Sequence, residues 1–229
     1  MATMAQTGKV FRDRRDAGRQ LADLLARFYT DQRLVLLALP RGGLPVAAEI
    51  AERLGRPLDV LIVRKLGVPG YEELAMGALA SGGVQVLNHD IISGLRVSRE
   101  QVDAVIQQES AELARREKLY RGDRPFPAIA GRTVMVVDDG IATGATMFAA
   151  VELLRQQNAG RIVVAVPVAP PDTVERLRKE ADEVIAVAEP EQFGSVGHWY
   201  ADFSQTGDDE VRELLEVAAE SKGSNGGGA

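Results

Sequence analysis

Short apolar runs recur along the chain, and polar residues, glycine or proline lie between them. Runs of this length that are apolar throughout are typical of strands buried on both faces of a sheet. Strands are predicted over residues 34–39, 58–63, 134–137, 161–168 and 183–188. A sheet made of such strands needs helices on both of its faces to exclude water.

The segments between the runs have the spacing of amphipathic helices. Leu21, Leu24, Leu25 and Phe28 follow the i, i+3, i+4, i+7 rule, which predicts a helix over residues 13–29 that covers the sheet and keeps its arginines in solvent. Further helices are predicted over residues 44–54, 98–118, 147–154, 172–181 and 208–219. Strands that alternate with helices predict an α/β fold with a doubly wound, mostly parallel sheet of five strands.

Capping signals mark several helix ends. Pro45 near a first turn and Gly55 just past a last turn bound the second predicted helix. Ser98 and Gln101 have the spacing of a capping box, and Asp172 is the predicted cap of a later helix.

Three stretches depart from the alternation. Residues 66–74 contain two glycines and a proline and are predicted to form a flexible loop. Residues 75–80 and 84–87, separated by Ser-Gly-Gly, predict a hairpin. Residues 190–206 are rich in rings and glycine and break the alternation of strands and helices.

These elements predict one domain over residues 1–220, with a core over about 10–190 and a less regular segment over 190–206. Residues 1–9 are small and polar and are expected to be loose. The glycine-rich residues 221–229 predict a disordered tail.

Composition narrows the class of protein. The chain has 229 residues, 45% of them hydrophobic and 26% charged, which is ordinary for a globular protein. The net charge of −6 provides no basic footprint for nucleic acid, and the lack of cysteine excludes disulfides and thiolate metal sites. No apolar run approaches the roughly 18 residues of a membrane span. No apolar signal-peptide core occurs near the start, so a cytoplasmic protein without a membrane partner is expected.

One stretch changes character twice within a few residues. The apolar run 134–137 ends in Asp138 and Asp139, and a turn of small residues, 140–146, then leads into a helix. Such a turn at a helix N-terminus favours an anion, and Thr143 and Thr146 add hydroxyl donors, which predicts a phosphate site. The two carboxylates suit sugar hydroxyls or a metal ion. The turn lacks the lysine of a P-loop and the Gly-x-Gly-x-x-Gly of a dinucleotide site.

Basic residues and glycines follow two other predicted strands. Arg41, Gly42 and Gly43 come after residues 34–39, and the glycines would let the backbone approach a ligand closely. A plain tight turn is the alternative. Arg64-Lys65 is placed at the end of the strand over residues 58–63, facing the crevice where open α/β sheets bind ligands, or else in solvent.

Two acids, a turn and Thr-Gly-x-Thr after a strand resemble the phosphoribosyl pyrophosphate (PRPP) motif of type I phosphoribosyltransferases. The Arg41-Gly42-Gly43 turn resembles the pyrophosphate loop of the same family, which commonly has a non-proline cis peptide, here Pro40–Arg41. The chain is most similar to the stand-alone phosphoribosyltransferases of that family.

The resemblance implies a transfer of the 5-phosphoribosyl group from PRPP to a nitrogenous acceptor, with release of diphosphate. Asp138 and Asp139 would bind the ribose hydroxyls and help to place Mg²⁺, and Arg41 and Arg64 would stabilise the departing diphosphate. The other substrate-binding residues that it implies are Gly42, Gly43, Lys65, Gly140, Ala142, Thr143, Gly144, Ala145 and Thr146.

The acceptor is narrowed by one departure from the family pattern. Enzymes for 6-oxopurines carry an aspartate before the first threonine of the motif, where this chain has Ala142, so another nucleobase is expected. Adenine enzymes use a loop glutamate near the base, for which Glu72 and Glu73 are candidates. In this family a less regular hood supplies the walls of the base pocket, and the resemblance makes residues 190–206 a candidate part of it. Trp199 and Tyr200 could stack on a planar base, or they could only pack the hood against the sheet.

Two alternatives from other classes stay open. A PRPP-sensing regulator would keep the acidic pair and the turn after it without turnover. A nucleotide-binding subunit would leave the chemistry to a partner. The resemblance also implies a place in nucleotide salvage and a homodimer.

Overall fold

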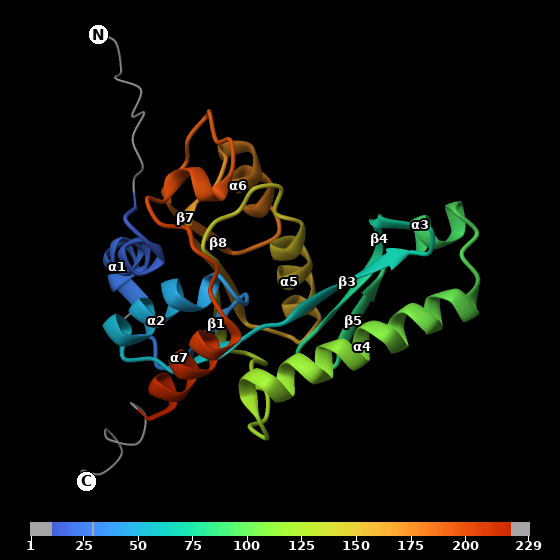
Figure 1. Ribbon diagram of the computed structural model, residues 1–229, viewed down its shortest axis with the longest axis horizontal. Coiled ribbons are helices and arrows are strands. Elements are labelled where there is room, and N and C mark those ends of the chain that lie inside the picture. Colours follow the sequence, from blue (N-terminus) through green and yellow to red (C-terminus); the bar gives the residue numbers. More distant parts are fainter. Residues whose placement is uncertain (1–10, 29, 221–229) are drawn as a thin grey trace.

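The apolar runs form the strands of one parallel sheet. The computed structural model describes residues 11–28 and 30–220 and orders the sheet β2-β1-β6-β7-β8 (Figure 1). The strands are β1 (Leu34–Ala38), β2 (Leu58–Val60), β6 (Thr133–Val137), β7 (Arg161–Val168) and β8 (Glu183–Ala188). The predicted five-stranded parallel sheet is confirmed. The predictions for residues 1–9 and 221–229 lie outside the described residues.

Helices cover both faces of this sheet. Alternate side chains of β1 point to opposite sides, so Leu34 and Leu36 belong to one apolar cluster and Val35 and Leu37 to another. The first face is covered by α1 (Arg14–Leu24), α2 (Gly43–Leu54) and α7 (Asp208–Glu220), and the second by α5 (Ala145–Gln156) and α6 (Pro171–Leu177). The doubly wound arrangement is therefore confirmed.

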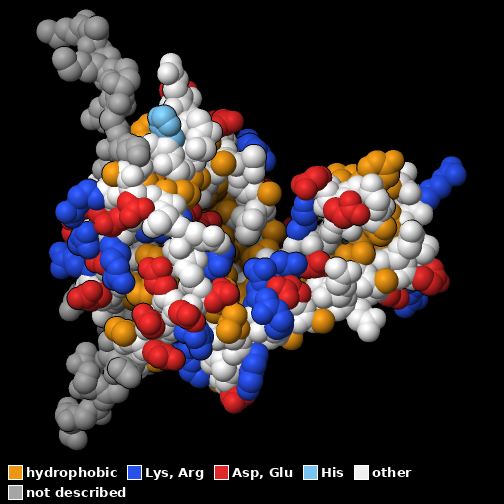
Figure 2. Space-filling model, viewed as in Figure 1, with side chains coloured by type: hydrophobic (Ala, Val, Ile, Leu, Met, Phe, Trp, Pro, Cys, Tyr) orange, Lys and Arg blue, Asp and Glu red, His pale blue; other side chains and the backbone are white. Residues whose placement is uncertain are grey.

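An arm projects from the core. It comprises an antiparallel sheet of β3 (Val63–Val68), β4 (Tyr71–Ala80) and β5 (Val84–Leu87), with α3 (His89–Gly94) and α4 (Arg99–Arg121). Figure 1 shows the arm reaching away from the five-stranded sheet, and Figure 2 shows the molecule hollowed between the two. The β4–β5 hairpin and the capping box of Ser98 and Gln101 are as predicted, whereas α3 was not predicted.

Two predictions for this region are wrong. The run over residues 58–63 is not one strand: β2 ends at Val60, and β3 begins at Val63 in the other sheet. The bend between them is held by Ser81, whose hydroxyl oxygen and backbone N–H bond the backbone of Ile62. Residues 66–74 are not a loop, because β3 and β4 pair through a turn at Pro69-Gly70, where Gly70 has a φ of +80°.

The helix ends differ slightly from the predictions. The first helix ends at Leu24, which is half exposed, and a 3₁₀ turn (Ala26–Phe28) follows. The cap of α6 is Pro170, and Asp172 lies in the first turn. The hood (residues 190–206) contains one 3₁₀ turn (Val196–Trp199). Its buried residues Phe193 and Tyr200 belong to one apolar cluster with Phe11, which precedes α1. Across the described part of the chain, no helix combines the length and apolarity needed to cross a membrane.

Candidate functional site

Two turns meet at the carboxyl edge of the sheet. Strands β1 and β6 are neighbours, with Ala38 opposite Val137, so the chain segments that follow them leave the sheet side by side. We call residues 40–43 the glycine turn and residues 138–141 the acidic turn. The first leads into α2, and the second leads through residues 142–146, the threonine loop, into α5.

The two turns are in direct contact through glycine. A Cβ on Gly42 would lie 2.0 Å from Oδ2 of Asp139, and a Cβ on Gly43 would lie 2.7 Å from the carbonyl oxygen of Val137. No side chain fits at such distances. We expected the glycines to make room for a ligand, but the structure shows that this room is occupied by the acidic turn itself. The Pro40–Arg41 peptide is cis, as expected.

The acidic pair is largely removed from water. Oδ1 of Asp138 accepts the backbone N–H of Asp139 at 2.9 Å, and Oδ2 of Asp139 accepts Nε–H of Arg14 at 2.7 Å. Burial raises the pKa of Asp138 well above its usual range, and the neighbouring charge of Asp139 raises it further. Burial also raises the pKa of Asp139, although Arg14 opposes this shift. One guanidinium therefore compensates two crowded carboxylates only in part, and a cation or hydroxyl donors would stabilise both.

This donor set suits a hard cation that keeps other ligands. Mg²⁺ is usually held by one or two carboxylates together with substrate phosphates and water. Asp138 and Asp139 could supply that share. Among residues 11–28 and 30–220, no cluster of three or more His, Cys, Asp or Glu side chains could enclose a metal ion.

The threonine loop is open to solvent at the N-terminus of α5. Thr143 and Thr146 are exposed, while Gly144 is buried and caps the helix with a φ of +81°, a conformation that side chains disfavour. Neighbouring elements fix the loop: the Thr173 hydroxyl of α6 donates to the carbonyl of Ala142 at 3.0 Å. A Cβ on Gly140 would lie 2.6 Å from Val196 of the hood. The remaining member, Ala145, is exposed at the first position of the helix.

Arg41 lies in the glycine turn and is about one third exposed. Its guanidinium is 3.8 Å from Asp208 at the start of α7, and the Tyr120 hydroxyl of α4 donates to the same carboxylate. The diphosphate candidate is therefore flanked by the C-terminal helix and by the base of the arm.

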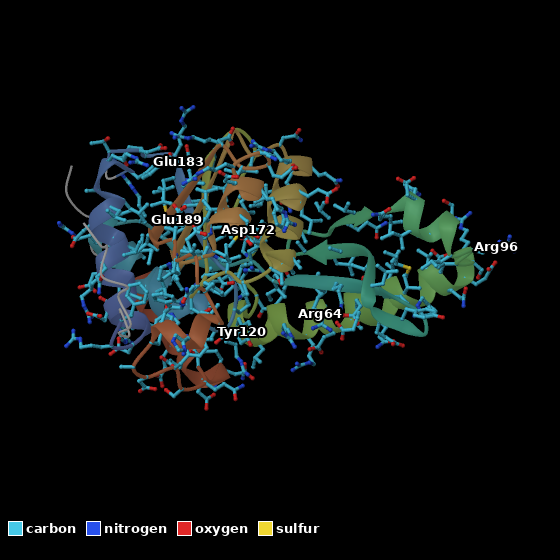
Figure 3. All side chains as sticks on the ribbon, turned by 90° about the horizontal axis from the view of Figure 1, so that it is seen from above. Arg64, Arg96, Tyr120, Asp172, Glu183 and Glu189 are labelled. Atoms are coloured by element: carbon cyan, nitrogen blue, oxygen red, sulfur yellow. The ribbon has the colours of Figure 1, made fainter. Side chains whose placement is uncertain are left out.

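Arg64 and Lys65 do not stand at the carboxyl edge of the parallel sheet. Both lie within β3 of the arm, where Arg64 pairs with Glu109 of α4 at 2.6 Å and Lys65 pairs with Glu73 at 3.4 Å. Figure 3 shows Arg64 on the arm, beyond Tyr120. The prediction is wrong because the apolar run before them changes sheets. With Glu72 they line a cavity of about 550 Å³ between the β3–β4 hairpin and α4.

The acceptor candidates are not brought together. Glu72 and Glu73 are exposed near the tip of the β3–β4 hairpin. Trp199 and Tyr200 are buried in the hood, where the indole N–H of Trp199 donates to the carbonyl of Phe193 at 2.9 Å. Of the two roles considered for these rings, packing the hood is the one that the contacts support.

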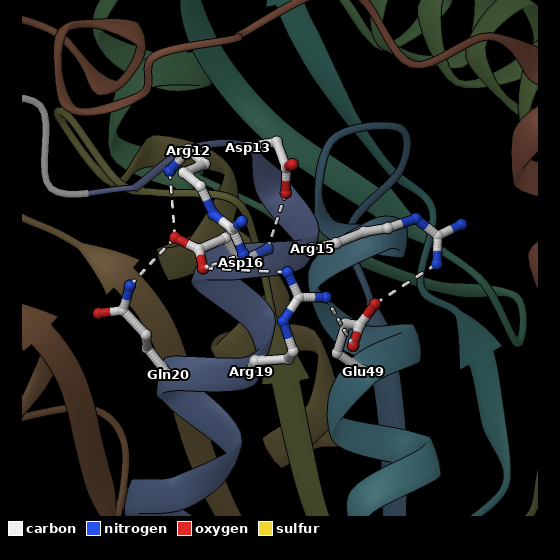
Figure 4. Close-up of polar contacts among 7 residues, drawn as sticks. All are labelled: Arg12, Asp13, Arg15, Asp16, Arg19, Gln20 and Glu49. Carbon is white, nitrogen blue, oxygen red and sulfur yellow. Dashed lines mark hydrogen bonds and ion pairs between the residues drawn. The ribbon is translucent and has the colours of Figure 1, made fainter.

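Sequence reasoning missed Arg14. The helix pattern placed the arginines of residues 13–29 in solvent, and most of them fit that description: Figure 4 shows Arg19 beside Asp16, and Arg15 against Glu49. Arg14 instead reaches the acidic turn. Nothing in the local pattern separates it from its neighbours, because its partner is distant in sequence.

Comparison with known proteins adds the following findings. The family described as "Phosphoribosyl transferase domain" matches residues 12–200. Proteins from two strains of Mycobacterium tuberculosis, CDC 1551 / Oshkosh and H37Rv, are provisionally named phosphoribosyl transferases and are each 49% identical over 210 residues. The alignment covers 92% of this chain and 47% of each relative, so this chain spans about half of their length. The crystal structure of TT1426 from Thermus thermophilus is 45% identical and superposes with a TM-score of 0.79, covering 90% of this chain and 97% of that one.

Proposed function

Since the chain belongs to the phosphoribosyl transferase domain family, we propose that it moves the 5-phosphoribosyl group of PRPP to a nitrogenous acceptor and releases diphosphate. The observation that supports this most is the contact between Gly42 and Asp139, which joins an anion-binding turn and an acidic turn into one site. PRPP carries a diphosphate and a 5′-phosphate on one ribose, and the turns on either side of the acidic pair match these two anions.

Each part of the site takes one part of the substrate. In this proposal Asp138 and Asp139 bind the ribose hydroxyls, and the threonine loop binds the 5′-phosphate through backbone N–H groups and hydroxyls. Arg41 and the backbone of the glycine turn bind the diphosphate, apart from the N–H of Gly43, which already donates to the carbonyl of Leu39 at 3.1 Å. Arg64 and Lys65 are left out, because their charges are paired within the arm.

The chemistry proposed is positioning and charge stabilisation, without a covalent nucleophile. As the bond between ribose and diphosphate breaks, positive charge develops on the sugar and negative charge on the leaving group. The buried carboxylates of Asp138 and Asp139 favour the first charge, and Arg41 favours the second. Mg²⁺ held at the acidic pair would neutralise diphosphate charge.

The acceptor proposed is a nitrogenous base other than a 6-oxopurine. Ala142 has no carboxylate that could assist a purine nitrogen, and its exposed side chain lies at the start of the threonine loop. Such a reaction would belong to nucleotide salvage.

Diphosphate release with PRPP and Mg²⁺, measured across a panel of purine and pyrimidine bases, tests the proposal. Release with at least one base is expected, and Asp138→Asn/Asp139→Asn should abolish it. Asp103→Asn on the exposed face of α4 is the matched control and should leave it unchanged. PRPP binding that is never followed by release would refute transfer to a nucleobase.

The ion pairs of Arg64 and Lys65 within the arm favour a second candidate function. With Arg64 held by Glu109, the described site offers the diphosphate fewer cations than the sequence suggested. A PRPP-binding regulator without turnover would fit this arrangement. Binding of PRPP by calorimetry, without release of its diphosphate in the presence of any base, is the result that would establish it.

A further inference from the structure

Arg14 makes contacts unlike those of the other arginines in α1. Its Nε donates to Oδ2 of Asp139 at 2.7 Å, and both side chains are nearly buried, at 12% and 14% exposure. A terminal nitrogen of the same guanidinium, Nη1, donates to the carbonyl of Ser204 in the hood. The guanidinium also lies 4.0 Å from the ring centroid of Phe203. One side chain thus joins the start of α1, the hood and the acidic turn.

The carboxylate of Asp139 is enclosed from several directions. Gly42 lies against Oδ2, the oxygen that Arg14 also contacts, and the Tyr200 hydroxyl donates to the backbone carbonyl of Asp139. Tyr200 in turn stacks against Phe203 at 5.0 Å between ring centroids. A carboxylate held by one oxygen in this way keeps a fixed direction for the other oxygen, Oδ1.

The neighbouring arginines provide a contrast within the same turn of helix. Arg15 is half exposed and pairs with Glu49 of α2 at 3.4 Å, and Arg12 is largely exposed. Figure 4 shows that these pairs stay among α1, α2 and the residues just before them. Exposed pairs of this kind contribute little to stability.

We propose that Arg14 is a positioning residue, which fixes the carboxylate of Asp139 for the ribose of PRPP by holding Oδ2 and by tying the hood to the acidic turn. This inference rests on the proposed function. Arg14 acts through Asp139 and touches no reacting atom. A misplacement of about 1 Å at a group that orients substrate can reduce turnover about a hundredfold.

The test uses the full chain and compares Arg14→Gln, Arg14→Lys, Asp139→Asn, the double variant Arg14→Gln/Asp139→Asn and the control Arg15→Gln. For each, the measurements are PRPP affinity by calorimetry with Mg²⁺, kcat and KM for PRPP, and the thermal midpoint. Arg14→Gln should weaken PRPP binding by about tenfold or more, and Arg14→Lys should recover part of it because it retains a cation. Arg15→Gln should behave as wild type.

The double variant tests whether Arg14 acts through Asp139. If Arg14 acts through Asp139, the double variant binds PRPP no more weakly than Asp139→Asn alone. A loss of PRPP affinity in the double variant equal to the product of the losses in the two single variants would overturn the inference. So would a lowered thermal midpoint in Arg14→Gln with PRPP affinity equal to that of Arg15→Gln. If Arg14→Gln does not fold, Arg14→Lys against Arg15→Gln decides by the same comparison. Failure of wild type and Arg15→Gln alike to bind PRPP is a different pattern, which removes the proposed function and this inference with it.

Discussion

At the residue scale, the site depends on which positions lack a side chain. Gly42 and Gly43 allow α2 to begin in contact with the acidic turn, since a Cβ at either position would collide with atoms of residues 137–139. Two glycines after a strand are visible in the sequence, and a close approach could be predicted from them. What they approach could not, because the neighbour is set by the pairing of β1 with β6.

Replacement of Gly42 by alanine should displace the acidic pair. The new Cβ would lie 2.0 Å from Oδ2 of Asp139, so the carboxylate has to move, and a loss of about a hundredfold in kcat/KM for PRPP is expected. Gly94 in α3 has open space around its Cβ position, and Gly94→Ala is the matched control, with activity unchanged. Wild-type kinetics in Gly42→Ala would show that the contact between the two turns does not matter for catalysis.

Long-range pairs between charged side chains are the residue-scale feature that the sequence hides. Arg14 and Asp139 are both conspicuous as residue types, yet a helical pattern reports only which face is apolar. Their contact depends on where α1 packs across the sheet edge. The same holds for Arg41 in the glycine turn and Asp208 in α7, which only the fold brings together.

At the element scale, the apolar strands that lie between helices are the best predicted parts. Residues 161–168 and 183–188 form β7 and β8 with the predicted bounds, because each run is apolar after its charged first residue. The run over residues 58–63 is also mostly apolar but spans two sheets. Hydrophobicity gives no information on where a chain changes partners, so the position of Arg64 and Lys65 could not be derived.

The attachment of the arm to the core depends on Arg121 at the end of α4. This buried guanidinium donates to Asp59 at 3.0 Å, to Glu117 at 3.1 Å and to the carbonyl of Val60 at 2.8 Å. Arg121→Met should lower the free energy of unfolding by about 3 kcal/mol, because it leaves polar groups beside β2 without their partner. Urea unfolding measures the loss, with the exposed Arg99→Met as control. Equal stability in the two variants would show that the network does not attach the arm.

The contact between α4 and α7 should respond to alkaline pH. Burial and the hydrogen bond to Asp208 raise the pKa of Tyr120 to about 12, above the value of about 10 for an unfolded tyrosine. Because the folded state holds this proton more tightly, the contribution is complete below about pH 10 and is lost as the pH rises toward 12.

The measurement is the difference in free energy of unfolding between wild type and Tyr120→Phe, followed by denaturant titration from neutral to alkaline pH. The stabilisation of wild type relative to the variant should shrink over that upper range, while the other tyrosines cancel in the difference. A difference that stays constant with pH would contradict a buried Tyr120 proton shared with Asp208.

At the scale of the whole molecule, the parallel sheet joins two strand–turn–helix units into one site. Residues 40–43 and 138–146 are far apart in sequence, and the neighbouring strands β1 and β6 place their carboxyl ends together. The motifs alone were sufficient to identify the family. The roles of the hood and of the arm in binding were not derivable, since neither Trp199 nor Glu72 carries a signal that distinguishes packing from binding. The relatives extend to about twice the length of this chain.

Calorimetric titration of PRPP in the presence of Mg²⁺ tests the central claim most directly, with ribose 5-phosphate and diphosphate titrated separately for comparison. If the glycine turn and the threonine loop hold two ends of one ligand, PRPP binds at one site per chain and at least about a hundredfold more tightly than either fragment. PRPP affinity no greater than that of diphosphate alone would contradict the account, because the two turns would then not act on a single substrate.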